Sequence, residues 1–571
     1  MEKAKRLLKN IFKDKRFVVI LIILVILVVL GIIIYNKKYS PTTETMTLDE
    51  YYEVADGETA VIIDGDLITK TDANVLGIVR DNKPYVEIKL LNDAIGDVYA
   101  YDDVEHTICY TTKEGIYKAN AKNKGYTFNA QSVSKDYTPF VEESGRAFLS
   151  LEFVKDTNGA EYTFNENPSR AAIYTAGKER TTATVEKDTP MRRFGGNRSK
   201  ILNTAKEDEV VTVVENYGSW SQILTKDGVL GCVENSYLED KETSKNKTGA
   251  AQENLSHNLM KEKIRMGWHQ IFNKTANEQV SSVIATAEGM NVISPTWIQI
   301  RDNNGNITDL SSANYVQFCH DKNIKVWSLV SNIEKDVDEG SLFKVAQNRE
   351  NLINNIINSV TAVGADGINV DMESVGDANV DGYVEFVKEL AIKCHEKGLM
   401  LSVDNYNVDS ANYKVGIQAR YADYIVMFGY DETWTGSPTA GSNNSMGFVK
   451  EGVEDMLDEG VDKNQLILAI PFYTRLWTQI GQNVTSETVT LKDTPGILTA
   501  NNATPTWLKE NKENYAEWQK GDGKCMIWIV DDKSLKERCD YAMSKNIAGV
   551  SAWKLGNETV DTWKMIKETI K

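Results

Sequence analysis

Two carboxylates and one amide alternate with apolar residues in the segment Asp366–Glu373 of this 571-residue chain. If the segment is a β-strand, Asn369, Asp371 and Glu373 share one face, because alternate residues of a strand point the same way. Neighbouring carboxyl groups can act as general acid and general base in a proton-transfer reaction. Polar groups inside a protein are costly unless they are bonded or used, so the alternative is a buried hydrogen-bond or ion-pair network.

The C-terminal part of the chain alternates apolar, strand-like runs with helical patterns. The runs lie at residues 264–271, 291–300, 324–331, 366–373, 399–405, 424–430, 466–473 and 547–554. Apolar residues with helical spacing occur between them, for example over 341–362 and 380–397. The alternation predicts an α/β fold with a parallel sheet, and eight units fit a closed (β/α)8 TIM barrel over residues 262–571. The surplus is expected in loops, chiefly 474–524, and a further run at 525–530 leaves the strand count open.

The carboxylate segment is the fourth strand of this series. Barrel enzymes place their sites at the C-terminal ends of the strands, so the polar face would point to the barrel interior and its mouth. This position favours a catalytic site over a structural network.

An unbroken apolar run, Phe17–Ile34, follows a basic segment at the start of the chain. The run is long enough to cross a bilayer and lacks a small-residue cleavage site after it, which favours an anchor over a cleaved signal peptide. The heavier positive charge before the run should stay in the cytoplasm. We expect a cytoplasmic segment (1–16), a transmembrane helix (17–35) and a polar tether (36–50), in a single-pass protein of the cell membrane with extracellular C-terminal domains.

Residues 51–176 contain a weak internal repeat of strand patterns. Alternating runs at 85–91 and 147–154 each precede two further strand-like runs. The arrangement resembles the duplicated stalk domain related to the copper-amine-oxidase N-terminal domain. It implies no copper, because no cluster of metal-ligating residues stands here.

A second strand-rich unit is predicted over residues 184–240, with short strands separated by glycine turns. The motif Trp220–Ile223, followed by Gly228–Val233, resembles the end of a bacterial SH3-like domain, a small β-barrel that can contact cell-wall peptide. A spacer is the alternative. Residues 241–261 are polar and are expected to form a linker.

The net charge of −18 is unevenly distributed along the chain. Residues 1–38 carry nine basic and two acidic groups, or +7, which leaves −25 for the remainder. So acidic an ectodomain is a poor binder of nucleic acid, because phosphate contacts need clustered lysine and arginine. The six cysteines and five histidines are dispersed, and this pattern indicates neither a disulfide framework nor a metal site.

The segment Asp366–Glu373 resembles the D-G-x-D-x-D-x-E signature of family 18 glycoside hydrolases. The branch it is most similar to contains bacterial cell-wall and spore-cortex N-acetylglucosaminidases. The supporting stretches are Val292–Trp297, Met427–Asp431, Ile470–Trp477, Trp528–Ser534 and Gly549–Gly556. The resemblance covers about residues 262–571 and implies the same barrel fold.

The resemblance implies a substrate-assisted retaining mechanism, one of the exceptions to the two-carboxylate rule. Glu373 would protonate the leaving oxygen and then activate water. Asp371 would orient the 2-acetamido group of the substrate, which attacks the anomeric carbon in place of an enzyme nucleophile. Tyr430 would hydrogen bond to this acetamide, and Trp553 would pack against the sugar ring. Further substrate contacts are expected from Asn369, Asp431, Tyr473 and Arg475, and no cofactor or metal is expected.

Asn369 stands where the family signature has its first aspartate, and an asparagine cannot share a proton with Asp371. The two main catalytic carboxylates are intact, so we expect hydrolysis of a polysaccharide with β-linked N-acetylglucosamine. Cell-wall peptidoglycan is the preferred substrate, and chitin is the alternative. A second hypothesis is a non-catalytic glycan-binding protein with the same barrel fold. The presence of both Asp371 and Glu373 argues against it. A structural role in an envelope complex is a third, suggested only by the two small domains.

Overall fold

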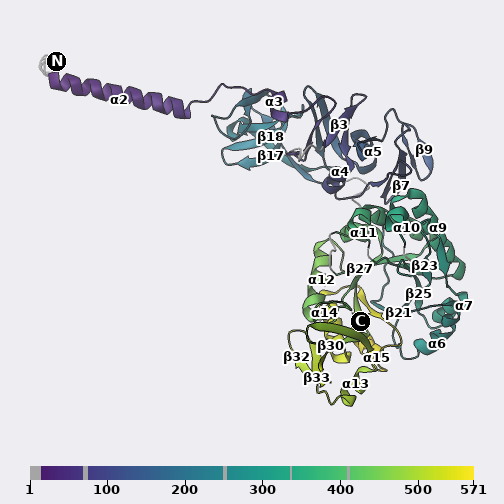
Figure 1. Cartoon of the computed structure of the whole chain (residues 1–571). Helices are drawn as coiled ribbons and strands as arrows, with labels where there is room; N and C mark the ends of the chain where they lie inside the picture. The colour runs from purple at the N-terminus through teal and green to yellow at the C-terminus, as the bar shows by residue number, and fades with distance from the viewer. Residues whose placement is uncertain (1–14, 69–74, 248–253, 335–336, 374, 408–411) are drawn as a thin grey trace. The chain divides into compact units, whose positions relative to one another are not determined.

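Eight parallel strands close into a barrel in the computed structural model of the chain (Figure 1). The structure describes residues 15–68, 75–247, 254–334, 337–373, 375–407 and 412–571. Two compact units are formed. The first comprises Met1–Ala94 and Glu143–Gly249, and the second Ile95–Glu142 and Ala250–Lys571. The domain predicted over 51–176 is therefore shared between both units.

The barrel belongs to the second unit and confirms the predicted fold. Its strands are β21 (Ile264–His269), β22 (Val292–Pro295), β25 (Lys325–Ser331), β26 (Gly367–Asp371), β27 (Met400–Tyr406), β28 (Tyr424–Phe428), β29 (Leu466–Pro471) and β35 (Gly549–Trp553). They are hydrogen bonded in this order, and β35 pairs with β21 to close the ring. A short hairpin of β23 (Ile298–Ile300) and β24 (Ile307–Asp309) extends from β25.

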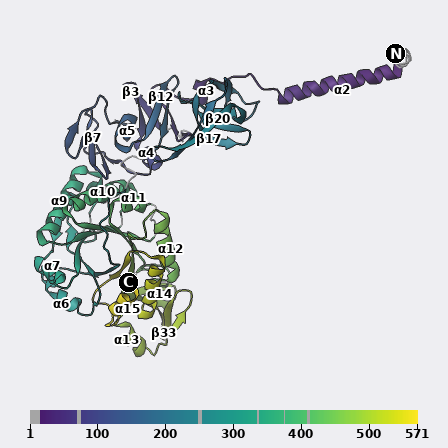
Figure 2. The same ribbon diagram turned by 180° about the vertical axis from the view of Figure 1, so that it is seen from behind.

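Helices surround the barrel (Figures 1 and 2). They are α6 (Val280–Val283), α7 (Ala313–His320), α8 (Glu339–Lys344), α9 (Ala346–Val363), α10 (Val380–Lys397), α11 (Val415–Tyr421), α12 (Met446–Asp458), α14 (Asp532–Lys545) and α15 (Thr562–Thr569). In α9, Leu352, Ile356 and Val360 recur at four-residue spacing and are fully buried against the outer face of the barrel. The helix ends at Gly364, whose φ of +73° an L-residue with a side chain rarely adopts.

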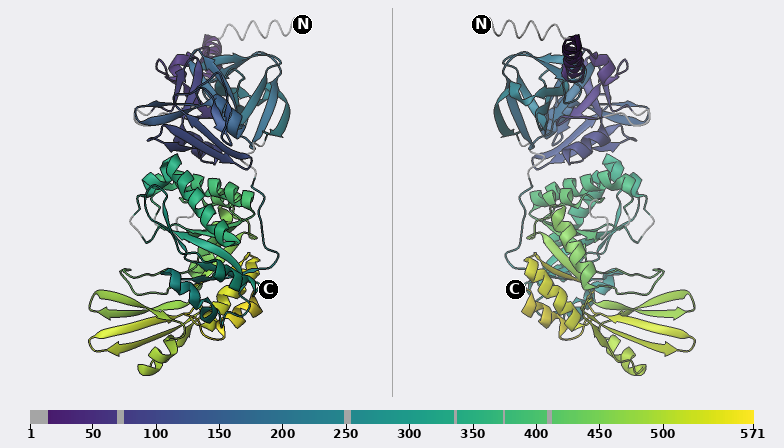
Figure 3. Two further views of the ribbon diagram at one scale, coloured as in Figure 1. Left: turned by 90° about the vertical axis from the view of Figure 1, so that its right-hand side faces the viewer. Right: turned by 90° about the vertical axis from the view of Figure 1, so that its left-hand side faces the viewer.

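The segment 474–524, predicted as loop, instead contributes most of a second sheet. Its five antiparallel strands are β30 (Tyr473–Ile480), β31 (Asn483–Thr490), β32 (Thr506–Leu508), β33 (Glu513–Lys520) and β34 (Gly523–Ile529), with α13 (Thr494–Ala500) between β31 and β32. This sheet projects from the barrel (Figure 3). The loop prediction was wrong because charged and hydroxyl residues are frequent in this segment, although a small core around Leu476, Val489 and Ile527 supports its strands. The run at 525–530 belongs to β34 and is not a barrel strand.

A third sheet of the second unit comes from residues far upstream. It consists of β5 (Ala100–Asp102), β6 (Thr107–Thr112), β7 (Gly115–Asn120), β8 (Tyr126–Phe128) and β9 (Gln131–Val133). Strands β5 and β6 contact α10, where the fully buried Lys388 lies 3.1 Å from Asp97 and 3.2 Å from Glu385. Such a buried charge cluster is stable only while each charge keeps its partners.

The first unit begins with α2 (Lys15–Tyr39), in which Lys15–Tyr35 is long and apolar enough to cross a membrane. Residues 1–14 of the predicted cytoplasmic segment lie outside the described residues. The elements that follow are α3 (Leu48–Tyr52), β1 (Ala60–Ile63), β2 (Asp66–Ile68), β3 (Gly77–Arg80), β4 (Lys83–Glu87), α4 (Ile88–Ile95), β10 (Phe140–Glu143), β11 (Arg146–Ser150), α5 (Leu151–Asn158), β12 (Glu161–Glu166) and β13 (Ser169–Tyr174). The predicted repeat is visible as two strand–helix pairs, β4–α4 and β11–α5. The runs 85–91 and 147–154 are therefore each strand only in their first half.

A seven-stranded antiparallel sheet completes the first unit. Its strands are β14 (Glu179–Val185), β15 (Thr189–Arg192), β16 (Ile201–Ala205), β17 (Val210–Tyr217), β18 (Trp220–Leu224), β19 (Leu230–Glu234) and β20 (Leu238–Lys245), in the order β16–β15–β19–β18–β17–β14–β20. Strand β20 pairs with β14 as far as Lys245, so this sheet continues into the segment predicted as linker, 241–261. The SH3-like identity of the unit stays a prediction.

Candidate active site

The fourth barrel strand, β26, separates its side chains as its alternation predicts. Ile368 and Val370 are fully buried in the core between barrel and helices. Asn369 and Asp371 occupy the opposite face, which in a closed barrel is the interior. Gly367 allows this packing, because a Cβ there would lie 2.6 Å from the Met400 carbonyl oxygen and 2.9 Å from the Trp327 ring.

Asp366, the first residue of the predicted motif, lies at the opposite end of the strand from the mouth and is structural. Its carboxylate accepts hydrogen bonds from the Val326 backbone N–H at 2.9 Å, Lys325 Nζ at 2.9 Å and His320 Nε2 at 2.7 Å. Burial alone would raise the pKa of Asp366, but these three donors lower it below its usual value. The residue ties β26 to β25 and α7.

Glu373 follows β26 and is partly exposed at the mouth of the barrel. The Tyr406 hydroxyl, at the end of β27, donates a hydrogen bond of 2.9 Å to its Oε2. Asn332, just after β25, holds the backbone of Glu373 from both sides, with Glu373 N–H donating to Asn332 Oδ1 and Asn332 Nδ2 donating to Glu373 O, each at 2.9 Å. The side chain of Glu373 is thus held from β27 and its backbone by the residue that follows β25.

Asp371 lies one level deeper and is only 8% exposed. Burial raises the pKa of Asp371 to about 8, and the nearby charges of Glu373 and Glu334 add to the rise. No lysine or arginine in the described part of the chain forms an ion pair with it. Burial without a cationic partner therefore favours the protonated form of Asp371.

Two aromatic residues predicted to contact the sugar flank this pair. Trp553 ends β35, and its ring centroid lies 6.0 Å from that of Trp268 in an edge-on arrangement. Tyr430 follows β28, stacked on Phe428 at 5.1 Å. Both rings pack on the interior core yet stay partly exposed, so each has a face available to a ligand.

Three further predicted substrate contacts, Asp431, Tyr473 and Arg475, form one cluster. Tyr473 Oη donates to Asp431 Oδ1 at 2.7 Å, and Arg475 Nη2 donates to the same oxygen at 2.6 Å. Tyr473 and Arg475 are both nearly buried, whereas the Asp431 side chain is 39% exposed. Of the three, Asp431 is thus the one best placed to meet a ligand, held by the other two.

Asn369 is fully buried, and its Oδ1 accepts hydrogen bonds from Trp268 Nε1 at 2.8 Å and Ser294 Oγ at 3.0 Å. Its Nδ2 donates to Ser402 Oγ at 3.0 Å and to Asp404 Oδ1 at 2.7 Å. The amide of Asn369 is therefore saturated by protein groups, and its role as a substrate contact stays a prediction.

The structure adds residues that the sequence reasoning missed, above all Asp404 and Tyr406. Both belong to β27, and with Ser402 they repeat on this strand the period-two polar pattern of β26. That pattern was a readable signal in the printed sequence.

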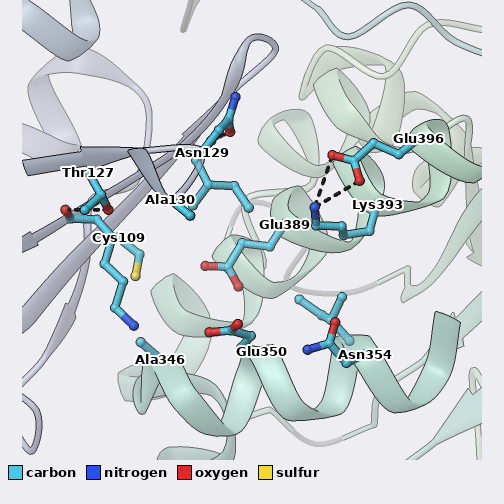
Figure 4. A pocket seen from close by; sticks show the side chains of 13 residues that line it. Cys109, Thr127, Asn129, Ala130, Ala346, Glu350, Asn354, Glu389, Lys393 and Glu396 are labelled. Atoms are coloured by element: carbon cyan, nitrogen blue, oxygen red, sulfur yellow. Dashed lines mark hydrogen bonds and ion pairs between the residues drawn. The ribbon is translucent and has the colours of Figure 1, made fainter. Parts of the chain in front are cut away.

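A cavity of about 450 Å³ lies elsewhere in the second unit, lined by strands β6 to β8 and by α9 and α10 (Figure 4). Its charged lining includes Lys118, Glu350, Glu389, Lys393 and Glu396. Lys393 pairs with Glu396 at 2.9 Å, and Glu389 pairs with the buried Arg349 at 3.2 Å. The cavity contains none of the residues of the β26 face and is separate from the candidate site.

Comparison with known proteins identifies two families along the chain. Residues 62–173 match the copper amine oxidase N-terminal domain, and residues 273–558, just over half of the chain, match glycosyl hydrolases family 18. The first match covers the predicted repeat and the second covers β26 with the whole mouth of the barrel described above.

Individual relatives are distant. The chain is 25% identical over 287 residues to the uncharacterized glycosylase YvbX of Bacillus subtilis (strain 168), covering 47% of this chain and 82% of that protein. It is 20% identical over 280 residues to the cortical fragment-lytic enzyme of the same organism, covering 46% of this chain and 64% of that protein. Among solved structures, the spore cortex-lytic enzyme SleL of Bacillus cereus matches with a TM-score of 0.49 at 16% identity, covering 58% of this chain and 77% of that chain. On the match over half of its length, the chain belongs to the family 18 glycosyl hydrolases, and its barrel is a glycoside hydrolase domain.

Proposed function

We propose that the barrel hydrolyses β-linked N-acetylglucosamine glycans, with Glu373 as the acid and base and Asp371 as the group that orients the substrate's acetamide. The observation that carries this proposal is the position of Asp371, which is buried directly behind the partly exposed Glu373. Burial raises the pKa of Asp371 to about 8. Glu373 has the access that a proton donor to a glycosidic oxygen needs, and the Tyr406 hydroxyl supports it at 2.9 Å.

The protonation of Asp371 favours substrate assistance over attack by an enzyme carboxylate. A neutral carboxyl group is a poor nucleophile, whereas its O–H and carbonyl oxygen can both hydrogen bond to an acetamide. When positive charge develops on the acetamide during attack on the anomeric carbon, a carboxylate at position 371 would stabilise it at short range. The reaction then proceeds with retention and without a glycosyl-enzyme intermediate.

Peptidoglycan is the substrate we propose, with chitin as the alternative. The apolar helix α2 supports this choice, because a membrane-held enzyme works beside the wall of its own cell. The relative named as a cortical fragment-lytic enzyme supports it as well. Trp553 and Tyr430 offer faces suited to pyranose rings of either polymer.

The activity is tested with the full chain in detergent micelles, by measuring new reducing ends from peptidoglycan and from chito-oligosaccharides. Wild type should release ends, and Glu373→Gln should lose at least about a thousandfold in rate, as expected for a missing general acid. Glu396→Gln, at an exposed position on α10, is the matched control and should keep the wild-type rate. Release by Glu373→Gln at the control rate would contradict the assignment, and binding without release by wild type would favour a glycan-binding protein.

The mechanism is tested separately with de-N-acetylated glycans. Without the acetamide carbonyl no internal nucleophile exists, so hydrolysis should stop although the glycosidic bond is unchanged. Equal rates on acetylated and de-N-acetylated substrate would exclude substrate assistance.

We further propose that α2 is a single-pass anchor with the catalytic unit outside the cell. Lys15–Tyr35 has a mean hydropathy of 3.9 and follows a segment rich in lysine and arginine. The full chain should stay with membranes through an alkaline carbonate wash, and external protease should digest it in intact protoplasts. A mature chain that begins after residue 35 and is recovered in the medium would instead show a cleaved signal peptide.

A further inference from the structure

A third carboxyl group, Asp404, lies beside the proposed catalytic pair and has no part in the mechanism described so far. Strands β26 and β27 are parallel neighbours in which Val370 pairs with Val403. The next position places Asp404 beside Asp371 on the same face of the sheet, with the strands about 4.8 Å apart. Asp404 is 4% exposed. Two acidic side chains thus share one level of the barrel interior.

The orientation of Asn369 determines how Asp404 is held. Trp268 Nε1 can only donate, so the Asn369 oxygen must face it, at 2.8 Å. The Asn369 NH₂ group must then point away from Trp268, and it donates to Asp404 Oδ1 at 2.7 Å. One oxygen of Asp404 is therefore committed as an acceptor, and a proton on this carboxyl group belongs on Oδ2.

Asp404 Oδ2 is buried and has no hydrogen-bond partner among the residues that the structure describes. The titratable groups that face Asp404 are Asp371 and Glu373 and the hydroxyls of Tyr383 on α10 and Tyr430 after β28. No lysine or arginine in the described ranges forms an ion pair with it. Burial, and then the Asp371 charge, hold the pKa of Asp404 well above its usual range, and the Asn369 bond offsets only part of this rise.

We infer that Asp404 is a positioning acid, whose buried Oδ2 offers a proton to Asp371 when that carboxyl group ionises. The inference rests on the proposed role of Asp371 toward the acetamide. A neutral neighbour allows Asp371 to take the negative charge that the mechanism requires, whereas an ionised Asp404 would oppose it. In this chain the acid beside Asp371 is therefore Asp404 on β27. Asn369, at the first position of the signature on β26, hydrogen bonds to Asp404.

Two substitutions separate a neutral donor from an anion. Asn at position 404 resembles a protonated aspartate and keeps an N–H donor, whereas Ala removes the donor. Asp404→Ala should lower kcat on the glycan by about 10- to 100-fold, the range for one hydrogen bond to a charged group, with little change in KM. Asp404→Asn should be at least about tenfold more active than Asp404→Ala at pH 7. It should also lose the part of the alkaline pH profile that depends on ionisation of Asp404. Equal loss in both variants would show that Asp404 acts as an anion and would overturn the inference.

A measurement without substrate keeps the inference testable if the enzyme has another substrate or if Asp404→Ala does not fold. Infrared difference spectra between the full-length wild type and Asp404→Asn at pH 7 should contain a protonated-carboxyl band that Asp404→Asn lacks. Identical spectra for wild type and Asp404→Asn would refute a protonated Asp404. An inactive wild type with the band present would instead contradict only the proposed activity.

Discussion

Replacement of Asp371 by Asn should stabilise the protein at alkaline pH while it removes activity. The pKa of Asp371 is about 8 in the folded chain against an ordinary value of 3.8. The folded state therefore binds more protons than the unfolded state between about pH 4 and pH 8, and the free energy of unfolding falls as pH rises through this window. At 1.36 kcal/mol for each pH unit, the full difference is on the order of 5 kcal/mol. Asn has no such titration and resembles the protonated acid.

Calorimetry of the full chain in detergent at pH 5, 7 and 8.5 measures this effect. The midpoint of Asp371→Asn should exceed that of wild type slightly at pH 5 and increasingly at pH 7 and 8.5. Asp366→Asn is a control of opposite sign on the same stretch of chain. Hydrogen bonds lower the pKa of Asp366, so its stabilisation is present at neutral pH and disappears only as pH falls through the acid range. A difference between Asp371→Asn and wild type that does not grow with pH would refute the assigned protonation of Asp371.

Three further changes test the site and its support. Tyr406→Phe removes the hydroxyl that donates to Glu373 and should lower kcat on the glycan by about tenfold, with KM nearly unchanged. Trp553→Ala removes a ring face proposed to carry the sugar and should raise KM at least about tenfold, measured on the same substrate. Lys388→Met removes a buried cationic partner from Asp97 and Glu385 and should destabilise the barrel unit by about 3–5 kcal/mol in thermal unfolding. Lys393→Ala, which breaks an exposed pair on the same helix, should cost less than about 1 kcal/mol.

The barrel was predictable because its strands are buried on both faces. Runs such as 466–473 are continuously apolar, so the barrel strands can be read from the printed chain, although the run at 525–530 left their number open. Closure of the sheet into a barrel was expected from the number of strand–helix units. The sheet β30–β34 escaped prediction for the opposite reason. Its strands carry charged and hydroxyl residues on their exposed faces, as in Glu513–Lys520, and a small core supports them. Their apolar content is too low to separate them from loop.

The upstream sheet β5–β9 was unpredictable in a different way. Its strands were expected as part of a stalk domain, and nothing local in residues 95–142 indicates that they belong to the unit of the barrel. The association depends on side chains far apart in sequence, such as the Tyr421 hydroxyl that donates to the Thr111 carbonyl oxygen at 2.8 Å. Pairings between positions separated by about three hundred residues leave no periodic signal.

Within the signature itself, each step of two residues moves a side chain about 7 Å along the strand toward the mouth. Asn369 is therefore fully buried, Asp371 nearly so, and Glu373 partly open, and access to the side chains increases in this order. Periodicity predicted that Asn369 and Asp371 share a face but did not reveal the depth of each residue. Depth also explains how a carboxyl group absent from β26 can be supplied by β27. The interior of a closed barrel is organised in levels, so a neighbouring strand at the same level offers an equivalent position. A signature read along one strand is consequently incomplete until the residues at the same level of the adjacent strands are read with it.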